Sequence, residues 1–174
     1  SNDGKVDSSP AAISITVREA AFTLPFTDNF ESEKRWTVNP DGTDTAPSGK
    51  WERGNPEGTD SDGPKQLDIT TSESTNLVTG RSAGSNVNSY DVDGVTTIRS
   101  PLIQLPAGQD ITLSFKYYFA HGRNATTADY FRVKVIGSST QTVLEVRGTN
   151  KDIDAAWKSF QASLKSFTGQ SVRI

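Results

Sequence analysis

Hydrophobic and polar residues alternate in two clear stretches of the second half of the chain. Residues 111–119 read ITLSFKYYF, with apolar side chains mainly at the odd-numbered positions, and YFRVKVI at 130–136 repeats the alternation. A period of two residues places every second side chain on the same face of a β-strand. Both stretches therefore predict antiparallel strands with one face in the core and the other in water.

Shorter strand candidates occur along the rest of the chain, separated by turn-forming residues. They lie at 37–38, 50–53, 77–79, 96–98, 142–146, 157–162 and 172–174. Turn-forming residues such as the NPDG of 39–42 separate them, and the polar segment 55–76 predicts one long surface loop. Many short strands with polar connections predict an all-β fold, a two-sheet antiparallel β-sandwich of the jelly-roll type.

The N-terminal segment differs in character from the rest of the chain. Residues 12–17, AISITV, alternate like a strand and are similar to the last strand of the Ig-like repeats of large bacterial surface proteins. Such a strand, separated from its sheet, would be an unpartnered edge. We therefore expect residues 1–21 to be the tail of a preceding Ig-like module or a linker, and residues 22–174 to form the sandwich.

Composition narrows the class of protein. The chain has 174 residues, 33% of them hydrophobic, and a net charge of −3, with its lysines and arginines scattered. That charge and scatter argue against nucleic acid as a partner. No apolar run reaches the roughly 20 residues of a membrane span, which argues against membrane insertion.

The absence of cysteine excludes disulfides and thiolate sites, and it favours a bacterial secreted or cell-surface protein over an extracellular eukaryotic one. Because it also lacks methionine, we expect the chain to be a piece of a longer protein.

Several motifs occur along the chain in an order that resembles a known family. They are DNFES and RWTV within 28–38, SGKWERGNPEGT at 48–59, NLVTG at 76–80, DVDGVTTIRSPLIQLP at 91–106, ITLSFKYYF at 111–119, ADYFRVKV at 128–135 and a late Trp157. This order resembles the MAM-like jelly-roll modules of secreted bacterial peptidases and other extracellular enzymes, over roughly residues 26–174. The resemblance implies a non-catalytic accessory domain that binds carbohydrate or protein, or braces the catalytic domain of the parent chain, with calcium as a cofactor in some members.

The chain departs from that family at its end. Modules of this kind carry a further strand with an acidic pair after the VRI-type strand, whereas this chain stops at GQSVRI. The resemblance therefore implies that the sandwich lacks its C-terminal closing strand. Either the chain was trimmed, or it is a fragment of a cleaved or split surface protein and a second chain completes the sheet by strand addition.

Carboxylates are the candidate calcium ligands. The resemblance points to Asp28 and Glu31 in the opening segment, and Asp91, Asp93 and Asp129 lie at strand ends where they could share a second site. An EF-hand loop is excluded, because alignment on Gly94 puts serine at both its first and twelfth positions. The alternative is that these acids serve as turn and cap residues, for which Asp-Gly sequences are well suited.

The sequence supports a catalytic function less than it supports a binding function. His121 is the only histidine, it lies at a strand end, and no G-x-S-x-G motif accompanies it. A single histidine without cysteine does not make the usual catalytic zinc site. A catalytic pair of carboxylates across a cleft can be chosen in many ways from 21 acidic residues, and no other feature of the sequence supports such a pair. We therefore expect no enzyme activity, and a jelly-roll glycan-active enzyme ranks third after the two interpretations above.

Aromatic residues are the remaining candidates for ligand contact, because sugar-binding modules stack exposed rings on pyranose faces. Tyr90 precedes the DVDG turn, Tyr118 lies on the polar face of its strand, and Tyr130 opens the next one. These three are the expected exposed rings, against the alternative of simple surface packing. The three tryptophans, in contrast, are expected in the core.

Overall fold

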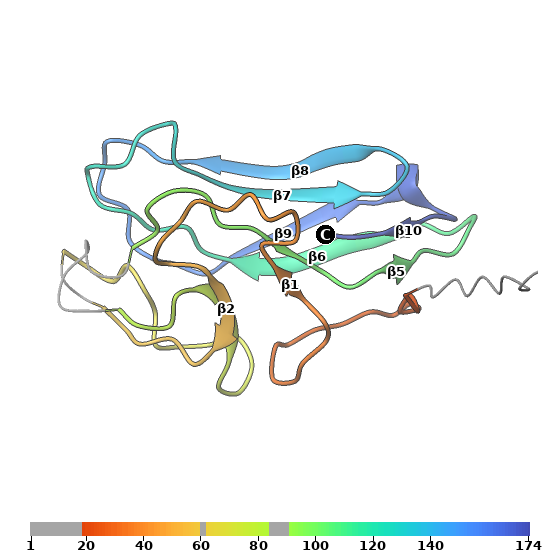
Figure 1. The fold of residues 1–174 in the computed structure, drawn as a ribbon, viewed down its shortest axis with the longest axis horizontal. Helices are drawn as coiled ribbons and strands as arrows, with labels where there is room; N and C mark the ends of the chain where they lie inside the picture. The colour runs from red at the N-terminus through yellow and green to blue at the C-terminus, as the bar shows by residue number, and fades with distance from the viewer. Residues whose placement is uncertain (1–18, 60–61, 84–90) are drawn as a thin grey trace, which may run out of the picture.

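The computed structural model describes residues 19–59, 62–83 and 91–174, and the regular elements of this part of the chain are β-strands joined by long loops, apart from one short 3-10 helix (Figure 1). The elements are β1 (Thr37–Val38), β2 (Trp51–Gly54), β3 (Asn76–Thr79), β4 (Ile98–Arg99), β5 (Ile103–Gln104), β6 (Thr112–Tyr117), β7 (Tyr130–Ile136), β8 (Thr140–Arg147), β9 (Lys158–Ser163), the 3-10 helix η1 (Lys165–Phe167) and β10 (Ser171–Val172). The all-β expectation is confirmed. The expected strand at 12–17 lies outside the described residues.

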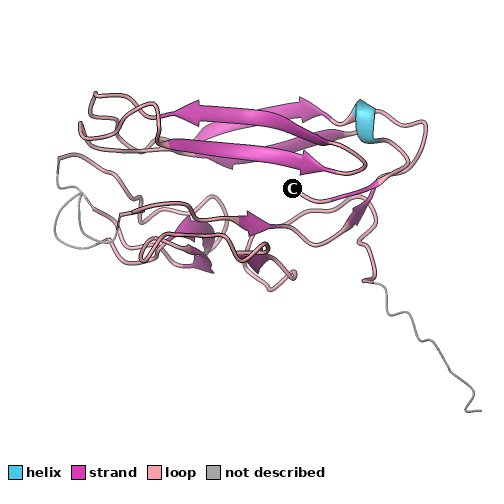
Figure 2. Ribbon diagram, turned by 45° about the horizontal axis from the view of Figure 1, so that its top comes forward, coloured by secondary structure: helices cyan, strands magenta, loops and turns pink. Residues whose placement is uncertain are grey.

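The strands pair antiparallel in two-stranded ladders. The long ladders join β6 to β9 and β7 to β8, and the short ones join β1 to β4, β2 to β3 and β5 to β10. Figure 2 shows the long strands together on one side of the molecule and the short ones across from them. Of the described residues, those before Ile111 thus contribute short strands and long loops, whereas both extended ladders are formed by later residues.

Alternation along the long strands agrees with the sequence pattern. In β6 the side chains of Leu113, Phe115 and Tyr117 are half-buried, while the polar residues between them are exposed. In β7 Val135 is fully buried and the neighbouring Lys134 is exposed. A strand with one face in the core and one in water produces this arrangement.

One apolar cluster joins the two sides of the fold. Its buried members are Ile103, Leu105, Ile111, Val135, Leu164, Phe167 and Val172, and partly buried side chains such as Phe26 and Ile174 pack against it. Phe167, contributed by the 3-10 helix, is 1% exposed. Residues from β5, β7, β10 and η1 therefore share a single core.

Isolated bridges join β5 to the N-terminal segment and the end of β7 to the residue after β10. Phe22 pairs in parallel with Ile103, and Ile136 at the end of β7 pairs antiparallel with Arg173. The Ile136 N–H donates to the Arg173 carbonyl at 2.8 Å, and the Arg173 N–H donates back at 2.9 Å. Since β10 pairs with β5 on its other edge, residues 171–174 lie inside the strand assembly, between β5 and β7.

Candidate functional site

The first of the predicted metal ligands, Asp28, has both carboxylate oxygens engaged by the protein itself. Its Oδ1 accepts the Phe30 N–H at 2.8 Å, and its Oδ2 accepts the Trp36 indole N–H at 2.7 Å. The second bond holds the half-buried Trp36 side chain against the segment that opens the domain. Asp28 therefore acts as a cap for its own turn and as an anchor for the tryptophan.

Glu31, predicted to act with Asp28, instead organises a loop far along the chain. Its Oε1 accepts hydrogen bonds from the Ser72 hydroxyl at 2.7 Å and from the N–H groups of Glu73, Ser74 and Thr75 at 3.0, 2.9 and 3.0 Å. Its Oε2 accepts the Ser74 hydroxyl at 3.1 Å. The hydroxyl of Ser72 and the backbone donors of the loop hold the pKa of Glu31 well below its ordinary value. Asp28 and Glu31 thus share a segment but bind different donors.

The loop that Glu31 folds forms one wall of a surface pocket, which we call the loop pocket. The cavity has a volume of about 400 Å³ and is lined by Asn55, Asp68, Ile69, Thr70, Ser72, Glu73 and Ser74. Its lining combines carboxylates, hydroxyls and an amide with one apolar side chain, Ile69, which is 65% exposed. A set of this kind offers hydrogen-bond donors and acceptors beside an apolar contact surface.

Asp91 and Asp93 lie in a turn that packs against the segment at 45–49. The Ser48 hydroxyl donates to the Asp91 carbonyl at 3.1 Å. Gly49 has a positive φ of 65°, and a Cβ there would lie 2.8 Å from Val92 Cγ2, so the approach requires glycine. Partial burial, together with the nearby charge of Asp93, raises the pKa of Asp91. The two carboxylates therefore interact unfavourably with each other.

Asp129 does not join the other candidate ligands. Its Oδ2 accepts the Thr126 N–H at 2.6 Å and the Thr126 hydroxyl at 3.2 Å, which closes the turn that precedes β7. Within residues 19–59, 62–83 and 91–174, no three or more His, Cys, Asp or Glu side chains gather in a metal-holding arrangement.

The three tyrosines expected at a ligand surface have different environments. Tyr118 is half-buried, packs edge-on against Trp157 with ring centroids 4.8 Å apart, and has its pKa raised by burial. Tyr130 is 43% exposed, with the Arg132 guanidinium 4.3 Å from its ring centre. Tyr90 lies outside the described residues. Of the described pair, Tyr130 is therefore the more accessible ring.

His121 occupies a structural position at the end of its strand segment. Its backbone bridges to Ile153, its Nδ1 lies 2.9 Å from the Gly122 carbonyl oxygen, and its ring packs edge-on against Phe119. The three tryptophans are half-buried, and Trp51 lies with its ring centroid 6.3 Å from that of Phe131. These contacts are those of packing residues.

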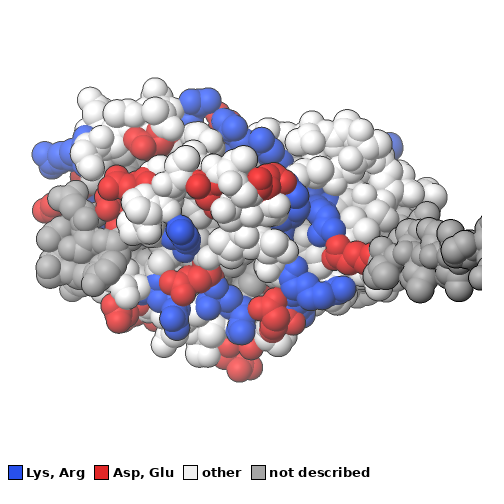
Figure 3. All heavy atoms as spheres, viewed as in Figure 1, with Lys and Arg blue, Asp and Glu red and all other residues white. Residues whose placement is uncertain are grey.

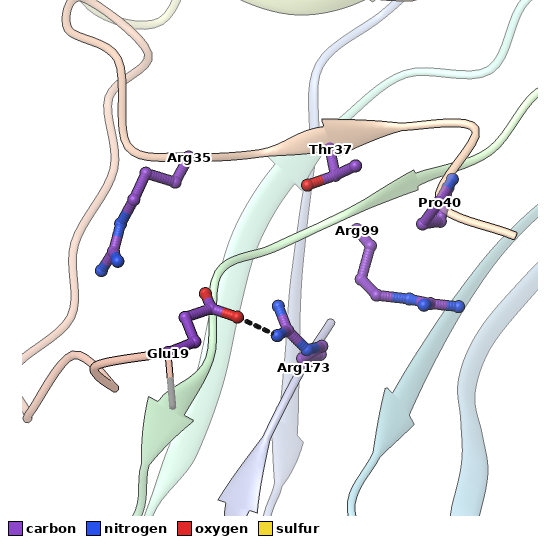
Figure 4. Close-up of a pocket in the computed structure, with 6 residues that line it drawn as sticks. All are labelled: Glu19, Arg35, Thr37, Pro40, Arg99 and Arg173. Carbon is purple, nitrogen blue, oxygen red and sulfur yellow. Dashed lines mark hydrogen bonds and ion pairs between the residues drawn. The ribbon is translucent and has the colours of Figure 1, made fainter. Parts of the chain in front are cut away.

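A second pocket, which the sequence did not indicate, lies beside the C-terminal strand. Figure 4 shows its lining residues, Glu19, Arg35, Thr37, Pro40, Arg99 and Arg173, around a cavity of about 350 Å³. We call it the arginine pocket. Its arginines come from segments more than 60 residues apart in the sequence, so no local motif marks them.

No protein-family model, curated protein or solved structure matches this chain. Among the described residues, no helix has the length and apolar character needed to cross a membrane.

Proposed function

We propose that this chain is a non-catalytic accessory module of a secreted or cell-surface bacterial protein, folded as a jelly-roll sandwich of two antiparallel sheets, and that it binds carbohydrate through the loop pocket. The observation that carries the proposal is the composition of that pocket. The amide of Asn55, the carboxylate of Asp68 and the hydroxyl of Thr70 lie around one cavity beside the exposed Ile69. The hydroxyls of Ser72 and Ser74 donate to Glu31 and add oxygen acceptors to the same lining. Sugars need such polar groups for their hydroxyls and an apolar surface for their C–H faces.

The loop that lines this pocket is ordered by hydrogen bonds within the protein, and this order favours ligand binding. The Glu31 carboxylate fixes the backbone of residues 73–75 through three N–H donors. A loop ordered before the ligand arrives loses less conformational entropy on binding. The ordered series of motifs that resembles MAM-like modules, from DNFES to Trp157, supports the same class of function.

Affinity electrophoresis in gels containing neutral polysaccharides tests the proposal. The wild-type chain should be retarded by at least one of them, and Asp68→Ala should abolish most of that retardation. Asp110→Ala, which alters an exposed acid outside the pocket, is the matched control and should migrate like wild type. If no polysaccharide retards the chain, or if both variants behave alike, carbohydrate binding at the loop pocket is wrong.

A calcium ion is part of the proposal, and Asp91 with Asp93 are the residues that fit it best. Burial and the nearby charge of Asp93 raise the pKa of Asp91, and a bound cation would relieve both effects on the Asp91 carboxylate. The oxygens of Asp28, Glu31 and Asp129 already accept hydrogen bonds from the protein. When bound, the ion would stiffen the turn at 91–94 against residues 45–49.

Thermal melting in millimolar calcium and in EDTA tests this assignment. At 100 times the dissociation constant a bound ion adds about 2.7 kcal/mol, which raises Tm by roughly 5–10 °C in a chain of this size. Asp93→Asn should remove most of the shift, while Asp110→Asn should keep it. Equal melting temperatures in calcium and EDTA would leave Asp91 and Asp93 as turn residues only.

The second candidate function is assembly with a partner chain by strand addition. The Ile136 backbone pairs with Arg173 on the edge of β7 away from β8. Alternate residues of a strand direct their backbone groups to the same edge, so Lys134 and Arg132 direct theirs to this edge as well. No described strand pairs with that part of β7, and an exposed edge of this kind recruits strands.

Solution mass tests this second candidate. Assembly with a second copy predicts a mass above that of one chain of 18.8 kDa. Lys134→Pro should return the mass to one chain without lowering Tm, because proline removes only an N–H that faces the open edge. A monomeric wild-type chain at high concentration would contradict self-assembly.

A further inference from the structure

The arginine pocket concentrates positive charge on a molecule that is acidic overall. Its lining holds three arginines and one glutamate, hence a net charge of +2, whereas the whole chain carries −3. Figure 3 shows lysines and arginines interspersed with acids over the face that it draws, so this face is not generally basic. Four segments of the chain bring these side chains together, around Glu19, at 35–40, at Arg99 and at Arg173.

Each guanidinium in the pocket is held in place by the protein and keeps donors free. Arg35 donates to the Ala20 carbonyl at 3.2 Å and lies 4.4 Å from the centre of the Phe22 ring. Arg99 pairs through Nη2 with Asp41 at 2.6 Å. These contacts use one of the five N–H donors that each guanidinium carries. No other described residue accepts from the guanidinium groups of Arg35 and Arg99, so their remaining donors can face a ligand.

Arg173 lies between the other two in Figure 4 and is the most constrained. Its Nη1 donates to the Ser100 carbonyl at 3.0 Å, and its Nη2 pairs with the Glu19 carboxylate. The hydrogen bond from Arg173 lowers the pKa of Glu19, so this acid stays ionised as an acceptor. The pocket therefore offers several cationic donors, one fixed acceptor in Glu19 and the hydroxyl of Thr37.

We propose that the arginine pocket binds the carboxylate of an acidic sugar, a uronate residue of a polysaccharide. Guanidinium groups bind carboxylates through paired, charge-assisted hydrogen bonds. Glu19 and Thr37 are suited to the sugar hydroxyls that a simple anion lacks. The volume, about 350 Å³, lies at the lower end of the range for small-ligand sites and accommodates one ring. This inference rests on the proposed carbohydrate-binding function but uses a pocket with different lining residues.

An acidic peptide fits these observations less well. An extended peptide gains its affinity from an exposed strand edge. The two strands that line the pocket, β1 and β4, have two residues each, and they already pair with each other on one edge. A peptide with repeated acids is therefore the competing ligand that the experiment has to exclude.

Titration calorimetry with three probes tests the inference. The probes are a galacturonic acid trimer, the neutral galactose trimer and a hexaglutamate peptide, each at low and at 0.5 M salt. The wild-type chain should bind the uronate trimer, and it should bind the other two probes weakly or not at all. Its affinity for the uronate should fall in high salt because the charges are screened. Arg35→Gln and Arg99→Gln should each weaken uronate binding about tenfold or more, since a charge-assisted hydrogen bond is lost.

Arg147→Gln is the matched control, because this arginine is 52% exposed and pairs with Glu145 outside the pocket. It should bind the uronate like wild type, and circular dichroism should be the same for all variants.

Uronate binding that survives both pocket variants would overturn the inference, as would hexaglutamate binding of equal strength. Binding of neutral sugar alone, lost in Asp68→Ala, would overturn it while leaving the proposed function intact. If neither sugar binds, this inference fails, whereas the proposed function is decided by the gels with neutral polysaccharides.

Discussion

The two halves of the chain are held together by different kinds of interaction. In the C-terminal half, β6 to β9 are six to eight residues long and pair over their full length, and five of the seven buried core residues, from Ile111 to Val172, belong to this half. In the N-terminal half, β1 to β4 contain two to four residues. There the chain is fixed by carboxylates that accept backbone N–H groups from distant loops.

Three acids illustrate the second kind of interaction. Glu31 binds the loop at 72–75, Asp44 accepts the Thr97 N–H at 2.8 Å, and Glu52 accepts the Arg81 N–H at 2.7 Å. Each of these bonds spans at least 29 residues of sequence. Apolar burial is independent of pH, whereas a hydrogen bond to a carboxylate weakens when that group is protonated. The comparison therefore predicts a robust ladder region beside a loop region that responds to acid.

The largest expected effect comes from the core of the ladder region. Phe167 is 1% exposed and belongs to the one apolar cluster shared by β5, β7 and β10. Phe167→Ala should lower the free energy of unfolding by about 3–5 kcal/mol, because it removes buried area and leaves a cavity. Val95→Ala, at a site that is 45% exposed, should change it by less than about 0.5 kcal/mol. Urea denaturation of both variants measures this, and a loss below about 1 kcal/mol for Phe167→Ala would contradict a single shared core.

A smaller and more local effect is expected in the loop region. Glu31→Gln should speed hydrogen exchange of the amides at 73–75 while the amides of β6 keep their wild-type rates, because only the loop loses its charged acceptor. Glu73→Gln alters an acid in the same loop whose side chain accepts none of these bonds, and it should exchange like wild type.

The pH dependence of that exchange follows from the sign of the pKa shift. The folded-state pKa of Glu31 lies below its ordinary value of 4.5, so its stabilising contribution is present above that pH. The contribution is lost as the pH falls below 4.5 toward the folded-state value. After correction for intrinsic rates, wild-type exchange at 73–75 should accelerate with acid and approach that of Glu31→Gln. A difference between the two that stays constant down to pH 2 would exclude Glu31 as the titrating group.

The sequence predicted the ladder region much better than the loop region, for a physical reason. Alternation in ITLSFKYYF and YFRVKVI is a local property, and β6 and β7 lie within those stretches. The strand β5 was not predicted, because Ile103–Gln104 is a two-residue segment between Pro101 and Pro106. It becomes a strand only through Val172 and Phe22, which are far away in the sequence.

The pockets were missed for the same reason. Glu31 was singled out as a metal ligand, yet nothing near it in the sequence indicates that its oxygens bind residues 72–75. The arginines at 35, 99 and 173 looked like scattered surface charge, and only the fold brings them to one cavity. Residues that reach one site from distant loops have no characteristic spacing in the sequence. A turn such as that at Gly94, with φ of 114°, is in contrast predicted by the adjacent residues Asp-Gly.

The smallest expected effect lies on the outer face of the ladder region, where Arg132 covers the ring of Tyr130 at 4.3 Å. A double-mutant cycle of Tyr130→Ala and Arg132→Ala, measured by urea denaturation, should give a coupling of about 0.5 kcal/mol, as for exposed cation–π pairs. A coupling of about 2 kcal/mol or more would mean that this surface pair contributes on the scale of a core residue. A weak coupling would also keep Tyr130 available as a ligand contact, because a sugar ring could displace the guanidinium at little cost in stability.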